Sequence, residues 1–263
     1  MDRILMNLHL DETLGAQYKS KSQKTRVMSE NWVGKNMFCP CCGNPHICGL
    51  KNNEPVADMK CNCCGEIFEL KSKEGRIGNR INDGAYATMV ARITSITSIT
   101  NPALFIMRYS KDYNVTDLTL IPKFFFVPHI IEKRKPLAPT TRRAGWTGCN
   151  ILYYKIPHQG KIKIIENGIL KSADEVVQHY GQIKKLETQN ITSRSWLLDV
   201  LNCVNRIETD EFCLQDVYAY GEVLQEKHRN NHNVEAKIRQ QLQFLRDKGF
   251  IVFLGRGHYR KRF

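Results

Sequence analysis

Residues 55–73 read P-V-A-D-M-K-C-N-C-C-G-E-I-F-E-L-K-S-K, and this stretch decides the fold. Its last third alternates apolar with polar side chains, which is typical of a β-strand with one buried face. We expect strands at residues 55–60 and 66–72, joined by the cysteine-rich segment between them. Successive side chains of a strand point to opposite faces, so Glu69 and Lys71 share one face. The stretch therefore predicts a hairpin that places charged groups beside a cysteine cluster.

The cysteines of this region have the spacing of a structural zinc site. Seven of the ten cysteines fall within residues 39–64, and two C-x-x-C pairs, each followed by glycine, are separated by 18 residues. Four thiolates complete a tetrahedral Zn²⁺ site and leave no position for a reacting water, so we predict a structural ion. The predicted zinc ligands are Cys39, Cys42, Cys61 and Cys64. Cys41 and Cys63 stand beside these pairs as alternative ligands, and a group of buried free thiols is the other alternative.

The same hairpin carries a second pattern, D-x(10)-E-x-K, formed by Asp58, Glu69 and Lys71. If the cysteine turn fixes the register of the two strands, Asp58 lies opposite Glu69. Both carboxylates then bind Mg²⁺ together with the carbonyl of Leu70. The metal would polarise a phosphodiester, and Lys71 would orient or help to deprotonate the attacking water, so we predict these residues to be catalytic. A pair of exposed, salt-bridged strands gives the same pattern without chemistry and is the alternative.

The charge of the chain favours a polyanionic partner. It holds 39 Lys and Arg against 26 Asp and Glu, a net charge of +13, and its pI is near 9.3. Nucleic acid is the first candidate for such a protein and an anionic membrane is the second. No segment approaches the ~20 apolar residues of a membrane span, and the N-terminus lacks the pattern of a signal peptide. We predict a cytoplasmic protein that binds DNA and no membrane.

The chain divides into two expected domains, residues 1–185 and residues 191–263. In the first we expect helices at residues 20–35 and 84–93 and further strands at 104–109, 118–121 and 161–165. A basic stretch rich in Pro and Gly, residues 131–150, is expected to be a long surface loop. Arg134, Arg142 and Arg143 of this loop are predicted phosphate contacts. Trp146, flanked by small residues, is predicted to lie against a base edge; a solvated charged loop with a core-filling tryptophan is the alternative.

The C-terminal part has the element order of a winged-helix domain. We expect helices at residues 196–207, 212–220 and 233–248, then a hairpin of residues 250–254 and 258–261. Residues 227–263 hold ten Lys or Arg against two acids. We predict DNA contacts from the exposed face of the third helix and from the wing, namely Lys237, Arg239, Gln240, Gln241, Arg256, His258 and Tyr259. An amphipathic helix of a protein-docking domain is the alternative.

The hairpin and three further stretches resemble the DpnI-type family of methyl-directed restriction endonucleases. These stretches are I-N-D-G-A-Y-A-T-M at residues 81–89, R-K-P-L-A-P-T-T-R-R-A-G-W-T-G-C-N at 134–150, and K-I-R-Q-Q-L-Q-F-L-R-D-K at 237–248. The likeness covers nearly the whole chain. The sequence departs from the family in the extra Cys41 and Cys63 and around residues 155–190.

The resemblance implies an α/β fold with a PD-(D/E)xK nuclease core and a zinc knuckle, followed by a small winged-helix domain. It also implies Mg²⁺-dependent cleavage of double-stranded DNA at G-A-T-C when the adenine is methylated. The alternative from another functional class is a regulator that uses zinc and the winged helix only to bind DNA.

Overall fold

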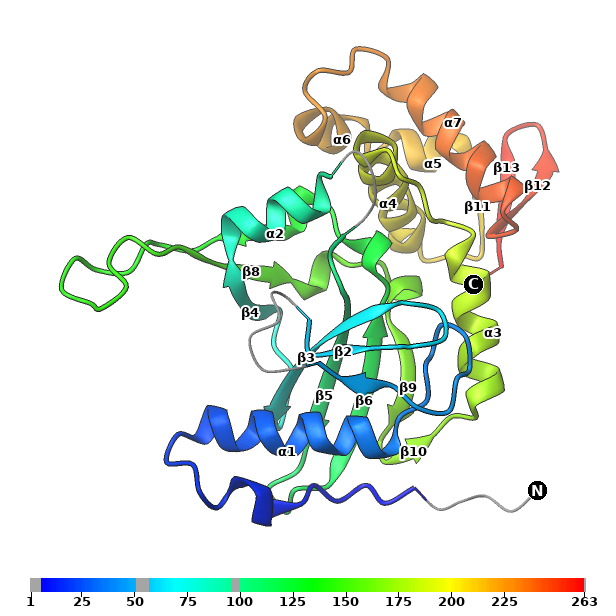
Figure 1. Ribbon diagram of the computed structural model, residues 1–263. Coiled ribbons are helices and arrows are strands. Elements are labelled where there is room, and N and C mark those ends of the chain that lie inside the picture. Colours follow the sequence, from blue (N-terminus) through cyan, green and yellow to red (C-terminus); the bar gives the residue numbers. More distant parts are fainter. Residues whose placement is uncertain (1–5, 51–56, 96–99, 263) are drawn as a thin grey trace.

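A mixed seven-stranded sheet forms the centre of the N-terminal part of the chain (Figure 1). The structure, a computed structural model, describes residues 6–50, 57–95 and 100–262. In sheet order the strands are β1 (Cys48–Gly49), β2 (Met59–Lys60), β3 (Ile67–Glu74), β5 (Ala103–Tyr109), β6 (Val115–Ile121), β9 (Ile162–Glu166) and β10 (Ile169–Leu170). β3 and β5 run parallel, and the other neighbours run antiparallel. β5 and β6 are almost entirely buried and form the middle of the core.

Most of the strands expected from the sequence are present. Those expected at residues 66–72, 104–109, 118–121 and 161–165 are confirmed as β3, β5, β6 and β9. The strand expected at residues 55–60 is described only at its end, as β2, because residues 51–56 lie outside the described residues. The second cysteine pair lies in the turn between β2 and β3, as expected.

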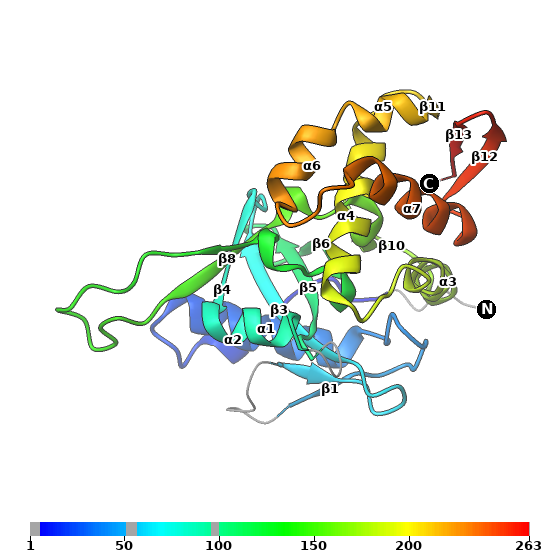
Figure 2. The ribbon, with the colours of Figure 1, turned by 90° about the horizontal axis from the view of Figure 1, so that it is seen from above.

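A second sheet of three strands lies beside the first. Its order is β4 (Arg80–Ala85), β8 (Gly148–Leu152) and β7 (Ile131–Lys133). The sequence analysis missed β4, because N-D-G is typical of a turn and the ladder with β8 overrides that local preference. The helix expected at residues 84–93 therefore starts later, as α2 (Tyr86–Ile93). The expected loop is shorter, since β7 and β8 form its base, and it projects away from the molecule (Figure 1 and Figure 2).

Helices flank the two sheets. α1 (Lys21–Asn36) packs along β3 and confirms the helix expected at residues 20–35, with Trp32 buried. α3 (Ala173–Lys184) packs on β9. Short 3-10 helices lie at Glu12–Gly15, Lys123–Phe125, Pro128–Ile130, Tyr153–Lys155 and His158–Gly160. No helix among the described residues is long and apolar enough to cross a membrane.

The C-terminal part is a winged helix, as predicted. Its elements are α4 (Ile191–Arg206), β11 (Glu211–Cys213), α5 (Leu214–Tyr218), α6 (Gly221–Lys227), α7 (Val234–Asp247), β12 (Ile251–Gly255) and β13 (His258–Lys261). Its sheet has the order β11-β13-β12. The second helix, expected at residues 212–220, begins instead with β11, because Phe212 pairs with Tyr259 of the wing. Only the short α5 falls within the expected range, and α6 follows beyond it.

α4 is the helix of the C-terminal part that faces the N-terminal part (Figure 1). The Arg194 side chain is buried and donates a hydrogen bond of 2.6 Å to the carbonyl of Ile93, at the end of α2. Gln159 and Asn205 exchange two amide hydrogen bonds of 2.9 Å. Buried polar contacts of this kind cost free energy when broken, so they join the winged helix to the N-terminal part in a defined orientation.

Candidate active site and DNA-binding surfaces

Two similar turns bring four cysteine sulfurs together. In the first, Gly43 N donates to the carbonyl of Cys39 at 2.8 Å, and in the second Gly65 N donates to the carbonyl of Cys61 at 2.9 Å. Gly43 and Gly65 have φ of 78° and 75°, a backbone conformation that favours glycine. Each C-x-x-C-G segment therefore folds into the same knuckle.

The predicted zinc ligands form the metal-ligand cluster of the described residues. This cluster consists of Cys39, Cys42, Cys61 and Cys64. Cys39 Sγ lies 3.7 Å from Cys64 Sγ, Cys42 Sγ lies 3.6 Å from Cys61 Sγ, and all four sulfurs lie within 4.8 Å of one another. Sulfurs placed tetrahedrally at ~2.3 Å from Zn²⁺ are separated by roughly 3.8 Å, so the spacing fits this ion. Cys41 and Cys63 lie outside the cluster.

The second knuckle also sets the register of β2 against β3. Met59 pairs with Phe68, and Asp58 N donates to the carbonyl of Phe68 at 2.9 Å, which places Asp58 opposite Glu69. One carboxylate oxygen of Asp58 accepts a hydrogen bond of 2.8 Å from Leu70 N. The backbone of β3 thus fixes the direction of the Asp58 carboxylate.

Lys71 lies between two carboxylates. Its Nζ contacts Glu69 Oε1 and lies 2.8 Å from Asp83 Oδ1. The side chains of Glu69 and Asp83 are 18% and 5% exposed, so solvent screens these contacts only weakly. Asp83 belongs to β4, and the sequence analysis did not select it. The sequence offered one indication of Asp83. It is the acidic residue of I-N-D-G-A-Y-A-T-M, one of the stretches that resemble the family.

The two carboxylates of Glu69 and Asp83 outnumber the single ammonium of Lys71. Burial is the main cause that raises the pKa of Glu69 to about 7; Lys71 opposes the shift and Asp83 adds to it. Burial lowers the pKa of Lys71, but the two carboxylates outweigh burial and raise it above its usual value. Burial raises the pKa of Asp83, but Lys71 outweighs it and holds that pKa below its usual value. One lysine serves two buried carboxylates, which leaves the site suited to a further cation.

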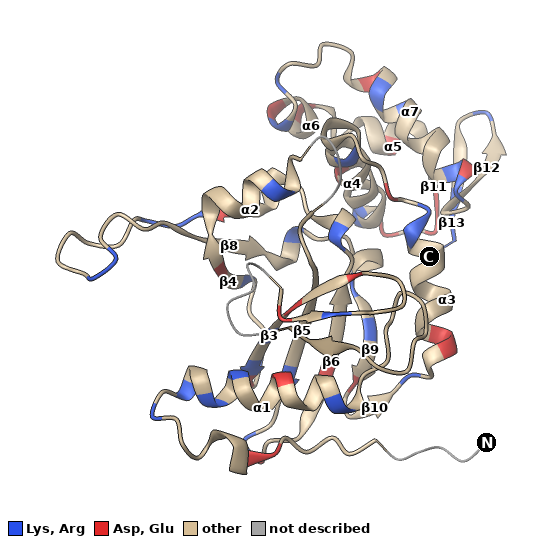
Figure 3. Ribbon diagram, in the orientation of Figure 1, with Lys and Arg blue, Asp and Glu red and all other residues tan. Residues whose placement is uncertain are grey.

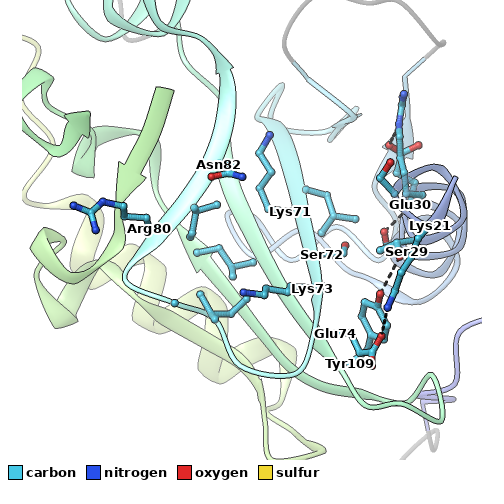
Figure 4. A pocket seen from close by; sticks show the side chains of 18 residues that line it. Lys21, Ser29, Glu30, Lys71, Ser72, Lys73, Glu74, Arg80, Asn82 and Tyr109 are labelled. Atoms are coloured by element: carbon cyan, nitrogen blue, oxygen red, sulfur yellow. Dashed lines mark hydrogen bonds and ion pairs between the residues drawn. The ribbon is translucent and has the colours of Figure 1, made fainter. Parts of the chain in front are cut away.

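Lys71, the centre of this group, also lines an open cleft of about 910 Å³ (Figure 4). β3 forms its floor, α1 one wall and β4 the other. The basic residues that line it are Lys21, Arg26, Lys71, Lys73 and Arg80. Lys and Arg positions also occur along α1, the projecting loop and the winged helix (Figure 3). The sequence analysis selected only Leu70 and Lys71 among the cleft residues, because the others come from three elements that meet only in the folded chain.

Trp146 lies at the base of the projecting loop. Its carbonyl accepts a hydrogen bond of 2.9 Å from Leu137 N, and the guanidinium carbon of Arg143 lies 4.5 Å from the ring centre. Trp146 is partly exposed, whereas Arg134, Arg142 and Arg143 are exposed. The loop therefore presents three arginines beside one aromatic ring.

The exposed face of α7 is narrower than predicted. Arg239 and Gln240 are exposed and Lys237 is partly exposed. The placement of Gln241 on this face is wrong, because only 5% of the residue is exposed. It lies one turn from Ile238 on the buried side of the helix.

The wing requires a second correction. Arg256 and His258 are exposed, as expected for contact residues. Tyr259 is buried, with 8% exposed, and its ring stacks on Phe212 at 5.4 Å and packs on Phe253 at 5.3 Å. The tyrosine therefore belongs to the core of the wing, which does not fit its assignment as a DNA contact.

Fold and site together define an α/β protein with a four-cysteine cluster, a lysine between two buried carboxylates beside a cleft lined by basic residues, and a C-terminal winged helix. Residues 6–189 match the family model DpnI, described as the Dam-replacing family, and residues 192–261 match the Dam-replacing HTH domain. The chain belongs to this family of DpnI-type methyl-directed restriction endonucleases, and the resemblance found from the sequence is confirmed.

Proposed function

We propose that the protein is a type II restriction endonuclease that cleaves double-stranded DNA at G-A-T-C carrying methylated adenine, by Mg²⁺-dependent hydrolysis. The observation that carries the proposal is the placement of Asp58 opposite Glu69, with Lys71 next along the same face of β3 and lining a cleft with further basic residues. Family membership and the net charge of +13 support a DNA substrate.

The donor set suits a magnesium ion. Asp58 and Glu69 supply carboxylate oxygens, and with the carbonyl of Leu70 they are the groups that would hold it. The raised pKa of Glu69 and the two carboxylates that share Lys71 indicate a site in which added positive charge stabilises the ionised acids. When bound, the ion supplies Lewis-acid polarisation of the scissile phosphate.

Lys71 acts on the attacking water. Because its pKa is raised, the ammonium is charged at neutral pH and donates hydrogen bonds rather than accepting a proton. It therefore orients the water and stabilises charge that develops on the phosphate. The basic residues of the cleft hold the flanking phosphates and bring the scissile bond over β3.

The four cysteines would hold a structural zinc ion. With sulfur in all four positions, the ion would have no place for water, and it would lock both knuckles. Because the second knuckle is the turn between β2 and β3, the zinc would keep Asp58 in register with Glu69. The zinc thus supports catalysis through folding.

Methyl reading requires more than one apolar contact. Burial of one methyl contributes ~0.8 kcal/mol, about fourfold in affinity. We propose that Trp146 makes one contact with a methylated adenine, while Arg134, Arg142 and Arg143 bind the phosphates around it. We assign a second reading to the proposed winged-helix domain, residues 191–263, through Lys237, Arg239 and Gln240, with Arg256 and His258 on the DNA backbone.

A DNA-binding regulator is the competing proposal, and one experiment separates the two. Plasmid DNA with and without adenine methylation at G-A-T-C is incubated with the protein in Mg²⁺ or in EDTA. The nuclease produces discrete fragments only from methylated DNA in Mg²⁺. A regulator shifts the mobility of the DNA and leaves it intact under every condition.

A further inference from the structure

The ion pair of Lys71 and Asp83 joins the two sheets of the N-terminal part. Lys71 comes from β3 of the seven-stranded sheet and Asp83 from β4 of the three-stranded sheet. Their charged atoms lie 2.8 Å apart, and the Asp83 carboxylate also accepts a hydrogen bond of 2.7 Å from Gly84 N. Asp83 is almost fully buried, and the proposed function gives it no role.

A bulge in β4 sets the direction of the Asp83 side chain. Asp83 pairs with Cys149 and Ala85 pairs with Gly148, so Gly84 is left without a partner in the ladder. The Gly84 carbonyl instead accepts a hydrogen bond of 3.5 Å from Cys149 Sγ. Bulges beside active sites commonly redirect a side chain in this way. The direction of Asp83 thus depends on how β4 pairs with β8.

β8 is the strand that directly follows the projecting loop. Thr147, just before it, accepts a hydrogen bond of 3.1 Å from Tyr86 N at the end of β4. The ring of Trp146 rests on Gly148, the first residue of β8. One small sheet therefore holds both the aromatic ring of the loop and the carboxylate that contacts Lys71.

We propose that Asp83 is a positioning residue that makes the placement of Lys71 depend on how the loop of residues 134–147 is seated on DNA. This inference rests on the proposed function. When Trp146 and the loop arginines engage a methylated site, the ladder of β4 and β8 holds Asp83, and with it Lys71, in the reacting position. On unmethylated DNA a differently seated loop moves β8 and withdraws the lysine.

With such coupling, methylated and unmethylated DNA differ in the rate at which they are cleaved and not only in the affinity with which they are bound. Displacement of a reacting group by ~1 Å lowers a rate by about 100-fold. A methyl contact alone changes affinity by only about fourfold. Linking the loop to Lys71 therefore converts a weak contact into a larger difference in rate.

The test uses the full chain and its Asp83→Asn and Asp83→Glu variants. Single-turnover cleavage of methylated and unmethylated duplexes is measured across a Mg²⁺ titration, with Kd for the methylated duplex measured without added Mg²⁺. We expect Asp83→Asn to lower the rate on methylated DNA by about 10–100-fold and to reduce the methyl preference of the rate, with Kd changed by less than about twofold. Asp83→Glu, which keeps the charge, should recover part of the rate. Asp112→Asn, the same change at an exposed acid on the turn between β5 and β6, is the matched control and should keep the wild-type rate and preference.

Several outcomes would overturn the inference. One is a wild-type rate and methyl preference in Asp83→Asn; another is a lost rate that returns at high Mg²⁺, which would make Asp83 a metal ligand. Folding of each variant is checked by thermal unfolding and by zinc content. If Asp83→Asn does not fold, the variant Asp83→Glu is combined with Trp146→Ala instead. If the fold-decrease in cleavage rate of the double variant equals the product of the decreases in the two single variants, the loop and Lys71 act independently. If the wild-type protein cuts neither DNA, the proposed function fails instead, a result distinct from normal cleavage by the variants.

Discussion

The ring of Trp146 rests on the α-carbon of Gly148. A Cβ built at Gly148 would lie 2.9 and 3.0 Å from two carbons of the indole, closer than ordinary packing permits. The first residue of β8 must therefore lack a side chain if the ring is to keep its place. This contact allows the role of the ring to be tested while the tryptophan itself is retained.

Gly148→Ala should weaken methyl discrimination without removing any group that contacts DNA. The added methyl displaces the indole, and we expect the preference for methylated over unmethylated DNA to fall by at least about fourfold, the contribution of one methyl contact. Binding of both duplexes is measured by fluorescence anisotropy. Gly34→Ala is the control, because a Cβ there meets open space. An unchanged preference in Gly148→Ala would show that the position of the ring does not matter for methyl reading.

Asp58→Ala, Glu69→Ala and Lys71→Ala should each abolish cutting while methylated DNA is still bound. Removal of one group that holds the metal or orients the water is expected to lower the rate by about 100-fold or more. The measurement is single-turnover cleavage together with an electrophoretic mobility assay. Asp112→Ala, the loss of an exposed acid on the turn between β5 and β6, serves as the control. Cleavage at the wild-type rate by Asp58→Ala or Glu69→Ala would remove these residues from the active site.

Cleavage at low Mg²⁺ should rise with pH through the neutral range. Burial is the main cause that raises the pKa of Glu69 to about 7, and the protonated carboxyl does not bind the ion. Below this pKa the proton competes with Mg²⁺, so the rate should fall by about tenfold per pH unit when Mg²⁺ is limiting. Excess Mg²⁺ should move the rise to lower pH. A pH midpoint that does not respond to the Mg²⁺ concentration would exclude Glu69 as the titrating group.

The raised pKa of Glu69 also predicts how the stability of the fold depends on pH when Mg²⁺ is absent. The folded-state pKa of Glu69 lies above its ordinary value of 4.5, so the fold binds this proton more tightly than the unfolded chain does. The resulting stabilisation is complete below the ordinary pKa and is lost as pH rises through about 7. Thermal unfolding without added Mg²⁺, and without a chelator that would remove zinc, should therefore show a lower Tm above neutral pH, and Glu69→Gln should reduce that dependence.

One zinc ion per chain should be found, and loss of a ligand should unfold the N-terminal part. Both knuckles depend on the ion, and structural zinc contributes directly to folding. Metal analysis and circular dichroism of Cys39→Ser and Cys61→Ser test this expectation. Cys41→Ser and Cys63→Ser are matched controls, since neither sulfur belongs to the cluster. If Cys39→Ser keeps its full zinc content while Cys41→Ser loses zinc, Cys41 and not Cys39 is the ligand.

The sequence predicted the features that repeat a short local pattern. Spacing alone identified the cysteine knuckles, and strand alternation placed Glu69 and Lys71 on one face. Asp83 was missed because its contact with Lys71 depends on a bulge and on pairing with a strand more than sixty residues away. Local preference at N-D-G indicates a turn, so no pattern within that segment predicts β4.

The errors in the winged helix have a similar origin. One residue along a helix turns the side chain by about 100°, so Gln240 faces solvent while Gln241 faces the core. A run of glutamines does not reveal where that boundary falls. Tyr259 is buried because β11 pairs with the wing, and the sequence analysis had assigned β11 to a helix. The boundary between the two domains at residues 185–191 stays a prediction.

Asp199 holds a cluster of charges where the winged helix meets the N-terminal part. Its side chain is 0% exposed and lies 2.5 Å from Lys227 Nζ, 3.0 Å from His228 Nε2 and 3.3 Å from His129 Nε2. His129 belongs to the N-terminal part and the other two partners to the winged helix. Burial raises the pKa of Asp199, but the hydrogen bonds from His129 and His228 outweigh it and hold the pKa well below its usual value.

Asp199→Asn should therefore loosen the attachment of the winged helix. Removal of one partner from a buried ion pair costs roughly 3–5 kcal/mol, and we expect the lower end because Lys227 and His129 are partly exposed. A carboxyl with a lowered pKa stabilises the fold above its ordinary pKa of 3.8 and loses that effect as pH falls. The difference in Tm between wild type and Asp199→Asn should thus be largest near neutral pH and shrink in acid. Asp247→Asn, an exposed acid paired with Arg246 at 2.8 Å, is the control and should change Tm little. Equal Tm values for wild type and Asp199→Asn at neutral pH would show that the two parts are held together without this cluster.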